Sequence, residues 1–390
     1  MKNNWLIVIL FIILGGLSVF LFTNCGGVSL TSEQNNLTEK NWSLVGGAGF
    51  SAGAATNFSL SLYRDTPYIA YVDDMNKISV MKFNGGTWES VSTTDFYTLY
   101  LASFSLAVYN STPYVAYRDA RIFGTGKDAR FGLATVMKFN GASWESVGPP
   151  GFTEGEAAYI SLAVDNGIPF IAYFDSTIGV TVMKFNGSSW ENVGTPNFTV
   201  GLPTSLSFAV NNGTPFAAYA DMANGEKATV MKFNGSTWES VGTPSFSAAD
   251  INSPSLSVYN GTPYLAYEDH DPRFVGPKDD LSPRVTVMKF NGASWECIGS
   301  QGFVQGEPVY LQVFNGTPYV AFVEDLGLYY GRVSVMRFNG SAWEYVGNQG
   351  FSNHVHSAFD VSLSISDNGT PYVVYSDVDN GNKATVMRYE

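Results

Sequence analysis

The chain has 390 residues, of which 45% are hydrophobic and 15% aromatic, so it can bury a substantial core. Its formal net charge is −13 and only 14% of its residues are charged, which disfavours nucleic acid as a partner because phosphate binding needs clustered Lys and Arg. The many Tyr, Phe, Ser and Thr residues indicate β-structure with polar, uncharged faces.

The N-terminal segment differs from the rest of the chain. Residues 5–22 form an uncharged apolar run that ends shortly before Cys25. Residues 21–25, Leu-Phe-Thr-Asn-Cys, resemble the lipidation box of bacterial lipoproteins, although Phe22 and Asn24 depart from the usual residues. The resemblance implies a signal peptide over 1–24, lipidation of Cys25 and a flexible linker over 25–39. An uncleaved helical anchor and an ordinary secretory signal stay open, and each places the domain outside the cytoplasm.

A repeat of about 50 residues dominates residues 40–390. Its markers are a Met-Lys-Phe-Asn-Gly segment, a Trp after it, a Phe eight residues later and a Pro after an Asn-Gly-type turn. The seven Trp residues are Trp42, Trp88, Trp144, Trp190, Trp238, Trp295 and Trp343. The seven Pro residues are Pro67, Pro113, Pro169, Pro215, Pro263, Pro318 and Pro371.

Each repeat predicts four short antiparallel strands. An alternating Ser-Leu-Ala-Val segment forms the first, and a tight Asn-Gly-Thr-Pro turn leads to the second, which is Tyr-Val-Ala-Tyr-like. Thr-Val-Met-Lys-Phe forms the third, and a second Asn-Gly turn leads to Trp-Glu-Ser-Val-Gly, the fourth. The chain ends after a third strand and starts with an isolated fourth strand at Trp42, so the two ends complete one blade.

These features predict an all-β fold, a seven-bladed β-propeller with four antiparallel strands per blade and an N-terminal strand closing the last blade. The architecture resembles WD-repeat and kelch-like propellers, but their Gly-His, Trp-Asp and Gly-Gly signatures are absent. The repeat is similar to that of uncharacterised bacterial cell-envelope propellers. We expect the recurrent aromatic residues to fill the space between blades, since a sugar-stacking role would need them exposed on one face.

An acidic residue closes the second strand of every blade. We expect these carboxylates to fix their turns by accepting backbone N–H bonds, with cation binding as the alternative. The ring consists of Asp73, Asp119, Asp175, Asp221, Asp269, Glu324 and Asp377.

Two insertions break the symmetry between the second and third strands, Ala120–Leu133 in blade 2 and His270–Pro283 in blade 5. Non-repeating residues on a repeated scaffold are candidates for ligand binding, with a functionless solvated insertion as the alternative. The chain's three histidines are expected on the same face, where a two-histidine metal site is less favoured than surface histidines without a ligand. The candidate ligand-binding residues are Arg121, Lys127, Arg130, His270, Asp271, Arg273, Lys278, His354 and His356.

Catalytic signatures are absent, so we expect no enzyme, no cofactor and no resident metal. Cys297 is expected to be a half-buried residue without a functional role. The sequence therefore favours a monomeric, lipid-anchored binding module of a bacterial envelope, at the outer membrane or cell surface, whose loop-bearing face contacts a protein or glycan. A propeller enzyme acting on polysaccharide and an envelope assembly scaffold are the alternatives.

Overall fold

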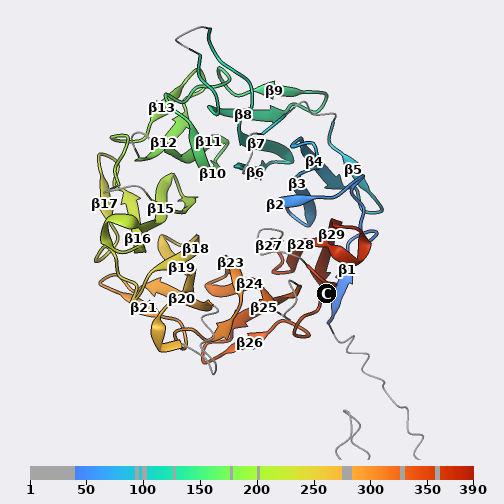
Figure 1. The fold of residues 1–390 in the computed structure, drawn as a ribbon, viewed down its shortest axis with the longest axis vertical. Coiled ribbons are helices and arrows are strands. Elements are labelled where there is room, and N and C mark those ends of the chain that lie inside the picture. The colour runs from blue at the N-terminus through green and yellow to red at the C-terminus, as the bar shows by residue number, and fades with distance from the viewer. Residues whose placement is uncertain are drawn as a thin grey trace, which may run out of the picture. The chain divides into compact units, whose positions relative to one another are not determined.

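The computed structural model describes residues 40–92, 96–98, 103–125, 129–175, 179–199, 203–274, 283–325, 330–355 and 361–390. The signal peptide, Cys25 and the linker that the sequence predicts therefore lie outside the described residues. Residues Lys40–Glu390 form one compact unit. Seven antiparallel sheets follow one another around a ring (Figure 1), which confirms the predicted propeller. Among the described residues, no helix is long and apolar enough to span a membrane.

Each blade uses its four strands from the ring's centre outwards (Figure 1). The first strands are β2 (Thr56–Tyr63), β6 (Phe104–Tyr109), β10 (Ala157–Asp165), β14 (Leu206–Asn211), β18 (Ile251–Tyr259), β23 (Glu307–Phe314) and β27 (Val361–Ile365). The second strands are β3 (Thr66–Val72), β7 (Thr112–Arg118), β11 (Ile168–Asp175), β15 (Thr214–Asp221), β19 (Thr262–Asp269), β24 (Thr317–Asp325) and β28 (Pro371–Asp377). The third strands are β4 (Ile78–Phe83), β8 (Ala134–Phe139), β12 (Gly179–Phe185), β16 (Lys227–Phe233), β20 (Arg284–Phe290), β25 (Gly331–Phe338) and β29 (Lys383–Tyr389).

The outer strands are short and begin at the repeated Trp residues. They are β5 (Trp88–Ser90), β9 (Trp144–Ser146), β13 (Trp190–Asn192), β17 (Trp238–Ser240), β21 (Trp295–Cys297), β26 (Trp343–Tyr345) and β1 (Trp42–Leu44). Strand β1 pairs with β29, with Trp42 opposite Tyr389, and so closes blade 7 as predicted. The remaining described elements are β22 (Val304–Gln305), η2 (Met222–Asn224), η3 (Pro272–Phe274) and η4 (Val378–Asn380).

The core lies in the seams, by which we mean the interfaces between neighbouring blades. Seven hydrophobic clusters occupy them, one to a seam. Alternate residues of a second strand serve opposite seams. In β19, Tyr267 packs toward blade 4 and Ala266 packs toward blade 6. A blade is therefore apolar on both faces, and each blade is stable only between its neighbours.

The repeated Trp residues fasten the seams. Six of the seven indole N–H groups donate to a Val or Ile carbonyl of the preceding blade, as Trp238 does to Val193 at 2.8 Å. The same six rings stack on the Phe of the link before them, as Trp238 does on Phe198 at 4.0 Å between centroids. Such a stack is worth about 0.5–1.5 kcal/mol beyond area burial, which assigns these aromatic side chains to packing.

The two edges of the ring differ in their connections. Because the strands alternate in direction, both hairpin turns of every blade lie at one edge, which we call the turn face. The connections between second and third strands and the links to the next blade lie at the other edge, which we call the loop face.

Candidate functional site

The blade 2 insertion on the loop face is organised around an ion pair. Arg121 places Nε 2.9 Å from each carboxylate oxygen of Asp119, and its guanidinium lies 5.5 Å from the centroid of the Phe123 ring. Asp119 is buried, whereas the side chain of Arg121 is 58% exposed. Burial acts to raise the pKa of Asp119, but the hydrogen bonds from Arg121 outweigh it and hold that pKa below its usual value. Arg121 is therefore committed to a buried partner.

Arg130 belongs to the same loop and is equally engaged. Its backbone pairs with that of Phe123 through hydrogen bonds of 2.8 and 2.7 Å. Its Nη1 donates to the carbonyl oxygen of Glu154 in the link to blade 3, at 3.0 Å. Lys127, the third basic residue predicted here, lies outside the described residues.

The blade 5 insertion repeats this arrangement. Arg273 places Nε 2.9 and 2.8 Å from the two oxygens of the buried Asp271. Gln301 accepts from Arg273 at 3.1 Å and donates to the ring acid Asp269 at 2.8 Å. His270 makes a separate contact, with Nδ1 2.9 Å from Oδ2 of Asp250. Lys278 lies outside the described residues.

Both insertions are pinned by a Phe packed on a glycine of the following link. A Cβ added at Gly151 would lie 2.7 Å from the Phe123 ring, and one added at Gly302 would lie 2.6 Å from the Phe274 ring. Only glycine permits this approach, and the φ of Gly151, +63°, also favours it. The same packing of a Phe on a glycine thus fixes each loop that carries an Arg. Blades 2 and 5 nevertheless lie on opposite sides of the ring (Figure 1).

His354 lies in the link between blades 6 and 7. Its Nδ1 is 3.1 Å from both carboxylate oxygens of Asp379, and its ring meets that of Tyr330 edge-on at 5.9 Å. His356 lies outside the described residues. The structure therefore gives His270 and His354 separate carboxylate partners, Asp250 in the link between blades 4 and 5 and Asp379 in the connection between β28 and β29. Among the described residues, no group of three or more His, Cys, Asp or Glu side chains could hold a metal ion.

The ring acids accept hydrogen bonds from their own blades and from neighbouring links. Asp377 accepts from Thr385 at 2.9 Å, from Asn380 at 2.9 Å and from Asn353 at 3.1 Å. Asp73 accepts the backbone N–H groups of Met75 and Lys77 at 3.0 and 2.9 Å. Asp269 accepts from Thr286 at 2.7 Å. These bonds tie the second strand to the connection that follows it.

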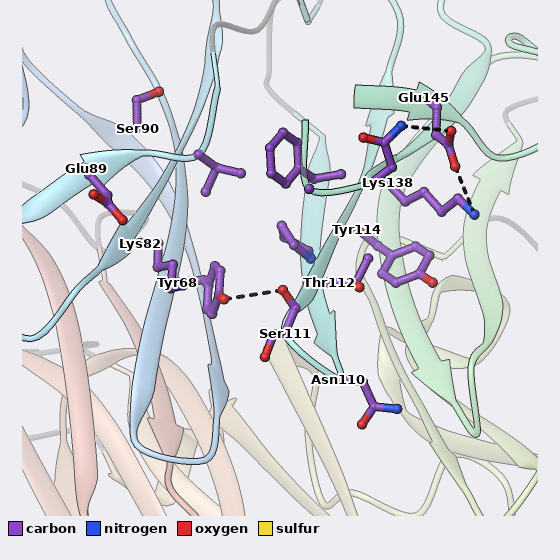
Figure 2. Close-up of a pocket in the computed structure, with 15 residues that line it drawn as sticks. Tyr68, Lys82, Glu89, Ser90, Asn110, Ser111, Thr112, Tyr114, Lys138 and Glu145 are labelled. Carbon is purple, nitrogen blue, oxygen red and sulfur yellow. Dashed lines mark hydrogen bonds and ion pairs between the residues drawn. The ribbon is translucent and has the colours of Figure 1, made fainter. Parts of the chain in front are cut away.

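The turn face, for which the sequence predicted no ligand site, contains grooves among the described residues. A groove of about 540 Å³, groove A, opens between blades 1 and 2. Blade 1 contributes Tyr68, Lys82 and Glu89, and blade 2 contributes its first hairpin turn, Asn110–Tyr114. Figure 2 shows Ser111 and Thr112 between Tyr68 and Tyr114, with the Tyr68 hydroxyl donating to the Ser111 carbonyl oxygen at 3.3 Å.

The third-strand Lys that blade 1 contributes to groove A has an arrangement that only blade 5 shares among the described residues, where Lys289 lies 5.7 Å from the centroid of the Tyr264 ring. In blades 2, 3 and 4 the Lys of the third strand pairs with the Glu of the fourth, as Lys138 does with Glu145 at 3.0 Å (Figure 2). Lys82 instead lies over the Tyr68 ring, with Nζ 5.7 Å from its centroid, and forms no ion pair with a described carboxylate. Glu89 accepts only from Asn84, at 3.3 Å, among the bonds that the structure describes. Groove A thus presents an ammonium that can donate hydrogen bonds to a ligand and a carboxylate that can accept them.

A second groove of about 420 Å³, groove B, lies at the seam between blades 7 and 1. It is built from the equivalent positions: Asp65 and Thr66 correspond to Ser111 and Thr112, and Arg388 corresponds to Lys82. The Tyr372 hydroxyl donates to the Asp65 carbonyl oxygen at 3.4 Å, as Tyr68 does to Ser111. Here the base is neutralised, because Arg388 lies 2.7 Å from Glu390.

The two grooves lie at seams where the first hairpin turn departs from the repeat. In blades 3 to 7 the residue two positions before the repeated Pro is glycine. A ring of the preceding blade approaches this glycine in three of these blades: a Cβ added at Gly167, Gly316 or Gly369 would lie 3.4, 3.6 or 2.7 Å from the ring of Tyr109, Tyr259 or Phe314, whereas one added at Gly213 or Gly261 would meet nothing within 4 Å. In blades 1 and 2 that residue is Asp65 or Ser111, which line groove B and groove A. A signal was thus present in the sequence, as the replacement of the turn glycine.

Comparison with known proteins supports the architecture and does not name a family. No family model matches the chain, and no curated protein does. Its fold resembles an ulvan lyase of polysaccharide lyase family PL25 bound to -[GlcA(1-4)Rha3S]-, with a TM-score of 0.55 and 11% identity over 87% of this chain and 94% of that one. It also resembles an ancestral GH74 enzyme, with a TM-score of 0.54 and 15% identity over 86% of this chain and 48% of that one. At such identities the likeness shows the fold alone.

Proposed function

We propose that this propeller binds carbohydrate on its turn face, through grooves A and B. The observation that carries the proposal is that grooves A and B are both lined by the residue that replaces the turn glycine, Ser111 in groove A and Asp65 in groove B. Groove A offers the hydroxyls of Ser111 and Thr112, the ammonium of Lys82 and the carboxylate of Glu89. Converging donors and acceptors of this kind suit a hydroxyl-rich ligand, whereas peptide recognition relies on apolar anchors.

Two structural relatives support the choice of ligand class, since one is a polysaccharide lyase and the other a GH74 enzyme. We favour binding over cleavage because of where the perturbed acid lies. Among the described residues, the carboxyl group whose pKa is raised belongs to Glu268, mainly through burial. Glu268 faces the seam between blades 5 and 6 and lines neither groove.

Native electrophoresis in gels that contain dextran, arabinoxylan, alginate or carrageenan tests the proposal. We expect at least one polysaccharide to retard the wild-type protein and the Lys82→Ala variant to lose most of that retardation. Lys232→Ala is the matched control, because Lys232 holds the equivalent position in blade 4 and is paired with Glu239 at 3.3 Å. Wild-type migration that none of the four polymers alters would overturn the proposal, and equal effects of both variants would remove the site from groove A.

The finer placement, a lipid-anchored position in a bacterial envelope, rests on the sequence around Cys25. Incorporation of labelled palmitate into the wild type but not into the Cys25→Ser variant is its test. Equal labelling of the two, or none in either, would contradict it.

A further inference from the structure

Grooves A and B are neighbours, separated by blade 1. They occupy consecutive seams on either side of blade 1, and Lys82 of β4 lines both of them. The end of β4 and its turn supply Phe83, Asn84 and Gly85 to groove B, while Lys82 faces groove A over the Tyr68 ring. Grooves A and B are therefore adjacent at the turn-face end of blade 1, where they share Lys82.

The lining of the two grooves repeats position by position. Each groove contains a hairpin Thr, a turn carbonyl oxygen bonded to a Tyr hydroxyl, a third-strand base and an Asn-Gly turn. A ligand that itself repeats along its length would meet equivalent groups twice, once at each seam. A small ligand would contact the groups of one groove and leave the equivalent groups of the other groove without a ligand.

We propose that the ligand is one extended polysaccharide chain that crosses the turn-face end of β4 and occupies grooves A and B together. This inference rests on the proposed carbohydrate binding and adds the polymeric nature of the ligand and its path. Occupation of the first groove raises the effective concentration of the chain at the second, so affinity increases without any new kind of contact.

The two grooves do not offer the same charge. In groove A the ammonium of Lys82 lacks a described carboxylate partner, whereas in groove B the guanidinium of Arg388 is held by Glu390 and the side chain of Asp65 is added. Groove A thus provides the free donor of the pair, and a uronate or sulfate on the chain would bind there. Groove B suits an uncharged sugar unit.

Isothermal titration with oligosaccharides of increasing length, cut from the retarding polysaccharide, tests this path. For the wild type we expect a step of about tenfold or more in affinity once the chain spans both grooves, the size of one additional modest subsite. Asp65→Gly and Ser111→Gly each remove one groove's turn side chain and restore the glycine of blades 3 to 7, so the fold should be retained. We expect each variant to bind short oligosaccharides and to lose the step, while Lys232→Ala keeps it.

The outcomes separate the two proposals. If no oligosaccharide or polymer binds the wild type, carbohydrate binding itself is wrong. If the wild type binds but its affinity does not change with chain length, or if both glycine variants keep the step, carbohydrate binding stands and the path across β4 is wrong. Circular dichroism and thermal melts of the two variants establish that any loss comes from the grooves and not from unfolding.

Discussion

Glu268 is the residue that departs most from its counterparts in other blades. The residue before the ring acid faces the next seam, and it is Val72, Ala220 or another uncharged residue in five blades. Blade 2 has Arg118 there, which forms an ion pair with Glu156 at 2.6 Å. Blade 5 has Glu268, which is 5% exposed, and the position equivalent to Glu156 is again an acid, Glu307. The two blades that carry insertions are thus also the two with charge in the seam.

Replacement of Glu268 by Gln should stabilise the protein at neutral pH. Burial is the main cause that raises the pKa of Glu268; a hydrogen bond with Ser253 lowers it in part, and the charges of Glu307 and His270 make smaller, opposite contributions. A raised folded-state pKa means that the carboxyl group favours folding at acid pH and that this contribution is lost as the pH rises through that pKa. We expect the free energy of unfolding of Glu268→Gln at pH 7 to increase by roughly 1 kcal/mol, with the difference vanishing near pH 4.

Urea denaturation across this pH range measures the difference, and the exposed Glu296→Gln is the control. A variant that is less stable than the wild type at pH 7, or a gain that is equally large at pH 4, would contradict the assignment.

Among the strands, the outer strand of blade 2 is the one whose Trp does not bond to the preceding blade, at the seam between blades 1 and 2. Trp144 has a buried indole N–H without a hydrogen-bond partner, and it meets Phe96 edge-on at 82° where the other six pairs stack. The cause lies in one substitution. A glycine follows the fourth strand's Val or Ile in six blades, but Ser92 takes its place in blade 1. At Gly194, φ is +73° and an added Cβ would lie 2.8 Å from Phe233, so a larger residue cannot follow the same path.

Ser92→Gly should therefore restore the Trp hydrogen bond at the seam between blades 1 and 2. With glycine in place, Val91 can present its carbonyl oxygen to Trp144 as Val193 does to Trp238, and we expect a gain of about 1 kcal/mol in the free energy of unfolding. Gly194→Ser, the reverse change in an intact seam, should cost more than that. Equilibrium denaturation followed by Trp fluorescence reports both changes, and a destabilised Ser92→Gly would show that another residue determines the altered path.

The strands were largely predictable because their signals are local and repeated. Alternation, Asn-Gly turns and the Trp and Pro markers determine the four strands, and the lone strand at Trp42 determines the closure. The grooves were missed because insertions such as Ala120–Leu133 are conspicuous, while Asp65 and Ser111 add no residue and leave a polar turn polar. Whether such a residue lines a groove depends on how the neighbouring blade packs beside the turn, which only a three-dimensional structure provides.

For the whole ring, we expect the non-covalent closure at blade 7 to have a large effect on stability. Strand β1 joins β29 through three residue pairs, and Trp42 adds a bond of 2.6 Å to the Val346 carbonyl oxygen and a stack of 3.9 Å on Phe351. Trp42→Ala should lower the free energy of unfolding by about 3–5 kcal/mol, as expected for a large core truncation.

Hydrogen exchange should locate the loss. Because β1 is held by no hairpin turn, we expect the amides of β29 to exchange faster in Trp42→Ala while those of β16 in blade 4 stay protected. Uniformly faster exchange in every blade would contradict a local opening at the closure.

The Trp-to-carbonyl bond has a consequence for how such a ring can diversify. Six of the seven seams carry this bond, and the ring is closed although the seam between blades 1 and 2 lacks it. The seams can therefore accumulate substitutions one at a time, because the other seams keep their own Trp hydrogen bonds. Under the proposed carbohydrate binding, substitution of one turn glycine at another seam would change the ligand-facing side chain there with no redesign of the scaffold beneath.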